Sequence, residues 1–243
     1  MLYTKELAIT PLSRESVQRL AAQKEDLELA ALASAAWTAY DQYQSTVQPA
    51  PKGKPAKGAD PWLWFTCWQA QRISDGETLA WMAFQGPQRH GQVTLTGWLT
   101  PKGEAAPNVP KAQDLGYQAV KKLTAWATSQ DTTYFITSVT GPADRSWAEA
   151  LRKAGFHPQE LGGGEQVWEL ERPASTWMTT YLCFGLAVGI SFGLSLFHNL
   201  SLGMCLGLCL GMAIGSVLDR SDKKLRQSLR EERKQARDDR VQE

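Results

Sequence analysis

The feature that most constrains this chain is a run of 46 residues, Pro173 to Leu218, without a single Asp, Glu, Lys or Arg. A helix needs about 20 apolar residues to cross a bilayer, so the run is long enough for two passes. It starts far from the N-terminus, and we therefore do not expect a cleaved signal peptide. The run predicts a transmembrane hairpin with helices over about 177–197 and 200–218, and a tight turn at His198 and Asn199.

The hairpin divides the chain into three predicted parts: a soluble domain over 1–172, the hairpin over 173–218 and a charged tail over 219–243. The whole chain carries 26 basic and 25 acidic side chains. Bulk electrostatic binding to nucleic acid needs a basic surplus, so we expect no nucleic-acid partner.

Charges on either side of the hairpin predict its orientation. The turn has no Lys or Arg, whereas basic residues flank both helices: Arg172 before the first, and Arg220, Lys223, Lys224 and Arg226 after the second. The positive-inside rule then gives a two-pass membrane protein with both termini in the cytoplasm. Trp177 and Tyr181 suit the interface. The tail is predicted to be an exposed helix that either contacts anionic headgroups or only fixes the topology.

Glycine recurs every four residues in both predicted helices. The positions are Gly185, Gly189 and Gly193 in the first helix, and Gly203, Gly207, Gly211 and Gly215 in the second. Steps of four place each set on one helix face, and glycine lets helix backbones approach closely in lipid. Two interpretations stay open: the glycines pack the hairpin against itself, or one stripe faces a second copy in a homo-oligomer. The helices carry no charge that would indicate a pore.

Cysteine and histidine spacing predicts no metal site. Cysteines at 67, 183, 205 and 209 form no CxxC pair, and the three histidines are scattered. No zinc-binding pattern results. The three cysteines within the hairpin are interpreted as small apolar packing residues.

Hydrophobic periodicity and turn signals predict the order β-α-α-β-β-β-α-β-α-β-β in the soluble part. The strands are Leu7–Leu12, Trp62–Ala70, Leu79–Phe84, Val93–Leu99, Tyr134–Val139 and two near 156–160 and 166–170. Of the helices, the first follows Ser13, the second begins near Lys24, the third runs from about Lys111 to Ser129, and the fourth follows Asp144. Strands that alternate with crossover helices imply an α/β fold with a mixed central sheet and helices on both faces.

Two local patterns stand within this order. The first is Gln113-Asp114-Leu115-Gly116-Tyr117-Gln118-Ala119, at the start of the third helix. The second begins at Asp144 and ends Ala150-Leu151-Arg152-Lys153-Ala154-Gly155-Phe156. With the element order, they resemble the GNAT superfamily of acyl-CoA N-acyltransferases over about residues 3–171.

The resemblance implies acetyl-CoA, or another acyl-CoA, as the cofactor. Backbone N–H groups of Gln113 to Ala119 would hold its pyrophosphate, as a helix N-terminus can. A backbone N–H near Trp98, Leu99 or Thr100 would polarise the thioester carbonyl. Gln118 stands where the family has Gly or Ala, and Leu151 where many members carry a Tyr that protonates the leaving thiolate.

Two functions remain open from the sequence. The first is a membrane-anchored, cytoplasm-facing N-acyltransferase that moves an acetyl group to an amine, favoured by the strand order and by Gln113 and Gly116. The second is a non-catalytic GNAT-like module that binds acyl-CoA or a partner, favoured by Gln118 and Leu151. No general base is assigned; candidates by residue type alone are Asp60, Glu77, His90, Glu104 and His157.

Overall fold

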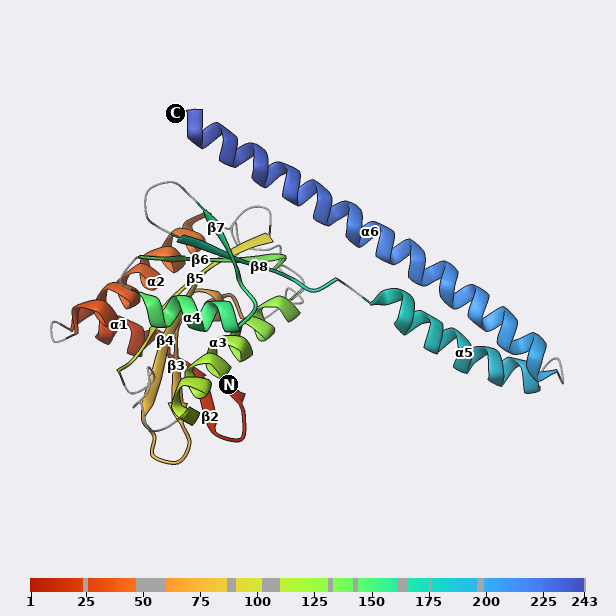
Figure 1. Cartoon of the computed structure of the whole chain (residues 1–243), viewed down its shortest axis with the longest axis horizontal. Coiled ribbons are helices and arrows are strands. Elements are labelled where there is room, and N and C mark those ends of the chain that lie inside the picture. The colour runs from red at the N-terminus through yellow and green to blue at the C-terminus, as the bar shows by residue number, and fades with distance from the viewer. Residues whose placement is uncertain are drawn as a thin grey trace. The chain divides into compact units, whose positions relative to one another are not determined.

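The chain forms two compact units in a computed structural model, Met1–Arg172 and Pro173–Glu243, here called the head and the hairpin unit (Figure 1). The structure describes residues 1–23, 26–46, 60–86, 91–101, 110–130, 133–141, 144–160, 166–174, 176–195 and 199–242. The predicted α/β class is confirmed: a mixed sheet flanked by helices is followed by two long apolar helices.

The head is built on one eight-stranded sheet with the order β1-β2-β3-β4-β5-β6-β8-β7. The strands are β1 (Leu2–Tyr3), β2 (Leu7–Pro11), β3 (Cys67–Arg72), β4 (Thr78–Gln85), β5 (Gln92–Leu99), β6 (Phe135–Thr140), β7 (His157–Glu160) and β8 (Gln166–Glu171). Neighbours are antiparallel except β5 and β6, which are parallel and joined through a helix. Strand β1 was not predicted; two residues are too short for a periodicity signal.

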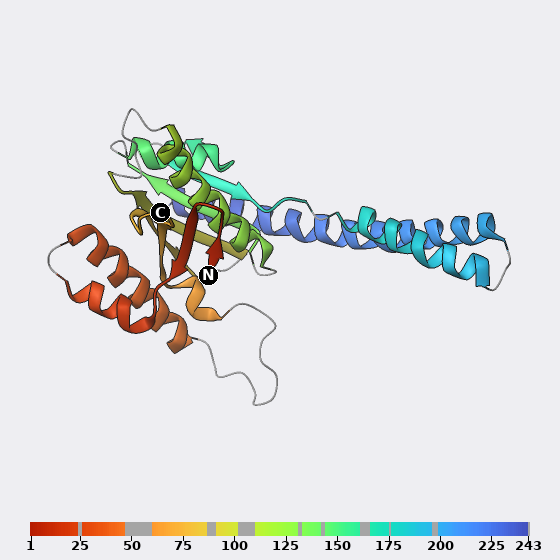
Figure 2. The ribbon, with the colours of Figure 1, turned by 90° about the horizontal axis from the view of Figure 1, so that it is seen from below.

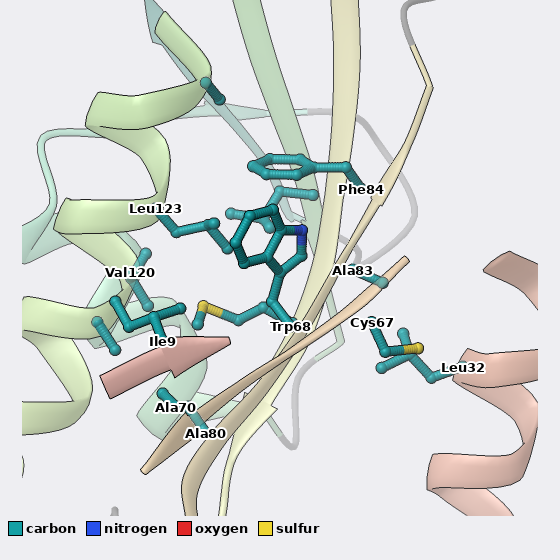
Figure 3. Packing of buried hydrophobic residues seen from close by; sticks show 14 of the residues in the cluster. Ile9, Leu32, Cys67, Trp68, Ala70, Ala80, Ala83, Phe84, Val120 and Leu123 are labelled. Atoms are coloured by element: carbon teal, nitrogen blue, oxygen red, sulfur yellow. The ribbon is translucent and has the colours of Figure 1, made fainter. Parts of the chain in front are cut away.

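Helices cover both faces of this sheet. They are α1 (Arg14–Ala22), α2 (Leu27–Thr46), α3 (Pro110–Ser129) and α4 (Arg145–Lys153). Leu123 of α3 packs beside Trp68 and Phe84 on one face, whereas Leu32 of α2 lies beside Cys67 on the other (Figure 3). The indole of Trp126, also on α3, lies 5.0 Å from Trp68 between ring centroids. The sheet thus has an α3 face and an α2 face.

Local signals explain where two of these helices begin or end. Ser13 caps α1, since its Oγ accepts the Ser16 N–H at 3.2 Å, as predicted. Gly155 follows α4 with φ of +98°, a conformation that glycine adopts readily. Asp144 occupies the N-cap position of α4, but its carboxylate accepts the Gly141 N–H at 3.0 Å and no helix amide.

The prediction of a strand over Trp62–Ala70 is wrong in its first half. Pro61–Trp64 form a 3₁₀ turn, η1, in which Asp60 Oδ1 accepts the Trp62 N–H at 3.0 Å. Proline fixes φ and suits the first position of a helical turn. The alternation of Trp62 and Trp64 matches the pattern of a strand, but these residues belong to the turn, and β3 begins only at Cys67. Proline and glycine content predicts a loop over 48–58 and a turn over 162–164, and both segments lie outside the described residues.

The hairpin unit consists of α5 (Trp177–Ser195) and α6 (Leu200–Gln242), antiparallel and side by side (Figure 2). Both are long and apolar enough to cross a membrane. Asn199 caps α6, because its Oδ1 accepts the Leu202 N–H at 3.2 Å. The predicted second apolar helix and the predicted helix of the charged tail form one element, because α6 continues unbroken past Leu218 into a segment where Leu, Lys, Arg, Gln and Glu favour helix.

Polar contacts fix the register of α5 against α6 at the end opposite the turn. The Asp219 carboxylate accepts the Met178 N–H at 3.3 Å and so satisfies a free donor in the first turn of α5. About two turns further on, Arg226 donates to the Pro173 carbonyl at 2.8 Å and to Asp222 at 2.7 Å. The first charged residues of α6 therefore stand level with the entry of α5.

All seven glycines of the two stripes lie between α5 and α6. A Cβ on Gly189 would stand 2.9 Å from Gly207 Cα, and a Cβ on Gly211 would stand 3.0 Å from Leu182 Cα. These neighbours are backbone atoms, which cannot rotate away. Within this unit the glycine stripes thus serve contact between the two helices of one chain; their role in a bilayer stays a prediction.

The chain should be separable after Arg172. The Arg172 N–H still donates to the Tyr134 carbonyl of the head at 2.8 Å, whereas the second compact unit begins with Pro173. We expect the fragment 1–172 to be a soluble, folded monomer by circular dichroism and light scattering. The fragment 1–165 is the control: it lacks β8, which lies between β6 and β7, and it should aggregate. An unfolded 1–172 fragment would place the boundary elsewhere.

Cys67 should make the head less stable at alkaline pH. Burial raises the pKa of its thiol from 9.0 to about 12. Between these values the unfolded chain loses a proton that the folded head retains, so stability present below pH 9 is lost as the pH rises. The loss is about 1.4 kcal/mol at pH 10. Thermal unfolding followed by tryptophan fluorescence should show this slope, and Cys67→Ala should remove it; an equal slope in both proteins would contradict it.

Candidate functional site

Strands β5 and β6 are paired only at their beginnings. Three residue pairs join them, ending at Thr94 and Thr137. Beyond that point β5 stays paired with β4 as far as Leu99, and β6 stays paired with β8 as far as Thr140. Among the described residues no pairing joins these second halves, so the two central strands part toward their C-terminal ends. We call the space between 95–99 and 138–140 the wedge.

The side chain of Trp147 spans the wedge on the α3 face. It comes from α4 and is only 2% exposed. Its indole Nε1–H donates to Ser138 Oγ on β6 at 3.3 Å. Its far ring edge, Cη2, lies 3.0 Å from where a Cβ on Gly97 of β5 would stand. The indole therefore bridges the two strands just beyond the point at which they part.

Gly97 is what allows the indole to lie against β5. A Cβ there would also meet the Trp81 carbonyl oxygen and, at 3.1 Å, Met82 Cα. The sequence reasoning did not single out Gly97, Ser138 or Trp147. A glycine in the middle of a predicted strand was the available signal, because it marks a close approach by another group.

The residues predicted to contact the thioester stand at the open end of β5. Trp98 is half-buried and lies opposite Trp81, and Leu99 is 8% exposed. The Thr100 N–H donates to the Leu79 carbonyl at 3.0 Å, and its hydroxyl donates to the Thr78 carbonyl at 2.7 Å. The backbone donor of Thr100 is thus already engaged by the neighbouring β4 segment.

Most of the predicted pyrophosphate segment lies beyond the first turn of α3. The helix begins at Pro110, so the amides free of helical partners belong to its first turn, and Pro110 has none. Of the predicted set only Gln113 falls in that turn; residues 114–119 follow it. Leu115, Gly116 and Ala119 are buried, Tyr117 is half-buried and Gln118 is exposed. The free donors are therefore those of 111–113, and pyrophosphate binding stays a prediction.

A row of polar residues crosses the α2 face beside the wedge. Thr94, Thr137, Glu169 and His157 are successive partners across β5, β6, β8 and β7. Ser138 faces α4, so its neighbour Thr137, and with it this row, points to the opposite face. Glu169 accepts a hydrogen bond from the Gln159 amide at 3.1 Å. Glu169 is a carboxylate that sequence reasoning missed, because only strand register brings it near the wedge.

Of the other acid–base candidates that the structure describes, His157 lies at the end of the polar row, and the rest stand elsewhere. Asp60 caps η1, and Glu77 pairs with Arg72 at 3.4 Å. His90 and Glu104 lie outside the described residues. His157 is exposed and lies opposite Glu169. Within the described part of the chain, no three His, Cys, Asp or Glu side chains gather as metal ligands would.

Solved structures similar to this chain include acetyltransferases. One of the GNAT family from Bacillus anthracis has 9% identity and a TM-score of 0.36, over 44% of this chain and 66% of that chain. One from Agrobacterium tumefaciens has 12% identity and a TM-score of 0.44, over 70% and 93%. An aminoglycoside acetyltransferase in complex with coenzyme A has 14% identity and a TM-score of 0.42, over 68% and 95%. No protein-family model and no curated protein matches the sequence.

Proposed function

We propose that this chain is a membrane-anchored N-acyltransferase that moves an acetyl group from acetyl-CoA to an amine. The parting of β5 and β6 beyond Thr94 and Thr137 carries the proposal. The pantetheine arm of coenzyme A has two amide groups, and strand edges without a strand partner can hydrogen-bond such amides. The wedge thus offers an extended acyl-carrying arm a place in the middle of the sheet.

The two sheet faces give the two substrates separate approaches. The first turn of α3 supplies free N–H donors for the pyrophosphate, and the amine would come from the α2 face. The amine, if it arrives as an ammonium ion, first releases one proton to solvent. Its neutral nitrogen then attacks the thioester carbonyl, the C–S bond breaks, and the nitrogen loses one further proton as the amide forms. Glu169, in the polar row, is the carboxylate suited to attract a cationic amine and accept that proton. The thiolate leaves without a tyrosine, because buried Leu151 stands in that place.

The second candidate is the non-catalytic module that binds acyl-CoA or a partner. Two observations favour it: Leu151 is fully buried and supplies no acid, and the Trp147 indole fills the inner end of the wedge. Release of free coenzyme A thiol in the presence of an amine separates the two candidates. Turnover supports the enzyme, and binding without turnover supports the module.

Membrane anchoring by the hairpin unit is part of the proposal. Large apolar side chains are exposed along both helices: Phe184, Val188, Phe192, Leu194, Leu202, Leu206, Leu210, Ile214 and Val217. Lipid is the environment that covers such a surface on a helix pair with no charge over its apolar length. We place both ends in the cytoplasm, because basic residues flank the hairpin and none lies in its turn.

Acetyl-CoA should bind the full chain in nanodiscs, measured by calorimetry. Lys111→Glu puts a negative charge into the first turn of α3 and should weaken binding at least tenfold, because it repels the pyrophosphate. Lys122→Glu is the matched control: the same charge reversal at an exposed position eleven residues further along the helix. A charged residue at Gly116 would be a poorer test, because Gly116 is buried and the charge would destabilise the core of the head. Equal affinities for the two variants would exclude the α3 site.

A further inference from the structure

We propose that Trp147 forms the closed inner end of the wedge and thereby limits the head to short acyl groups. This inference rests on the proposed acyl-CoA site. Trp147 has no assigned role in the pattern from Asp144 to Phe156, and it comes from α4, outside the strands that form the wedge.

The position of the indole along the wedge carries the argument. The last paired residues are Thr94 and Thr137. Trp147 contacts β6 one residue beyond this point, at Ser138, and β5 three residues beyond it, at Gly97. Only two further residues of each strand, to Leu99 and Thr140, extend past the indole, or about 7 Å at the rise of a strand. A thioester with two acyl carbons needs only this outer part, whereas a longer chain would have to occupy the space of the indole.

The indole is held too firmly to act as a gate. Trp147 is 2% exposed, and Ala150 and Leu151 bury the same side of α4. Turning the ring out would leave the fully buried Ser138 without this donor, and a lost hydrogen bond in a buried site is costly. At Gly97 the ring edge and the β4 backbone at Met82 lie 3.0 and 3.1 Å from the same Cβ position, so the indole has no room to move toward β4. Because the indole is fixed, the wedge accepts short acyl chains and excludes long ones.

The test compares acyl-CoA chain lengths on the full chain in nanodiscs. Calorimetry gives the affinities for acetyl-, butyryl- and octanoyl-CoA. Wild type should bind acetyl-CoA at least tenfold more tightly than octanoyl-CoA. Trp147→Ala removes the indole and should lower this ratio at least tenfold, through tighter binding of octanoyl-CoA. Trp126→Ala is the matched control, because it removes an indole from the α3 core away from the wedge and should keep the wild-type ratio.

Trp147→Leu is the second variant, for use if the alanine variant fails to fold by circular dichroism, and it should shift the ratio in the same direction. An unchanged ratio in folded variants that still bind acetyl-CoA would overturn the inference and leave the proposed function standing. Equal wild-type affinity for acetyl- and octanoyl-CoA would overturn it as well. Absence of all acyl-CoA binding, in wild type and variants alike, would instead reject the proposed function and with it the inference.

Discussion

Replacing Gly207 with leucine should push α5 and α6 apart and destabilise the hairpin unit. A Cβ at this position meets the Gly185 carbonyl oxygen and lies 2.8 Å from Gly189 Cα. Because both are backbone atoms, relief requires a shift of a whole helix. The shift forfeits many contacts of about 0.1–0.2 kcal/mol each, in a setting where such contacts hold helices together. We expect a lower melting temperature and a longer distance between spin labels at exposed positions 187 and 206.

Ala213→Leu is the control for this prediction. It adds similar bulk to the same helix, but at an exposed position. Gly207→Ala should fall between the two, because it adds the Cβ alone. Equal melting temperatures for Gly207→Leu and Ala213→Leu would show that the stripe does not hold the helices together.

Light scattering on these variants also addresses self-association. A stripe that faces a second copy would give an oligomeric wild type and a monomeric Gly207→Leu, with little change in melting temperature. The placement of all seven glycines between α5 and α6 favours the opposite result, in which the mass stays constant and the stability falls.

The second prediction with a large expected effect concerns topology: of two introduced cysteines, one should react fully with a reagent outside the cell and the other not at all. In a chain whose four native cysteines are replaced with alanine, we introduce Ser201→Cys in the first turn of α6 or Ser228→Cys beyond the charged boundary. Both serines are exposed, and both changes exchange one oxygen for sulfur. An impermeant thiol reagent added outside intact cells should label position 201 and leave 228 unlabelled until the cells are opened. Asn199 is unsuitable, since it caps α6.

The reverse pattern, with 228 labelled from outside, would place the termini on the far side of the membrane and reject a cytoplasm-facing head. Labelling of both positions in intact cells would show that the hairpin does not span the bilayer. The positive-inside rule predicts neither result, because every Lys and Arg near the hairpin lies on the side of Arg172 and Arg220.

Much of the architecture could be predicted from local pattern. Alternation and turn residues located β4 and β5. The helical spacing of Leu115, Ala119, Leu123 and Trp126 predicts a buried face of α3; the first three are buried and Trp126 is half-buried. The errors arose where local pattern is ambiguous. Tryptophans two apart at 62 and 64 match a strand and a 3₁₀ turn equally, and Pro61 decided between them.

The site was harder to predict because it depends on contacts between distant segments. Gly97 and Trp147 meet although fifty residues separate them, and Glu169 joins the polar row only through strand register. Because α3 begins at Pro110, its free amides belong to residues 111–113, and the motif at 113–119 overlaps them only at Gln113. Sequence pattern locates elements, whereas tertiary packing decides which side chains share one space.

The unbroken course of α6 makes it a stiff lever. The helix continues for 24 residues beyond Leu218, a length of about 36 Å at the rise of an α-helix. Transmembrane helices commonly tilt by about 20°, and a change of that size would sweep the end of such a rod sideways by about 12 Å. Since tilt adjusts to bilayer thickness, the charged arm would convert a difference of a few ångströms in lipid length into a much larger displacement in water.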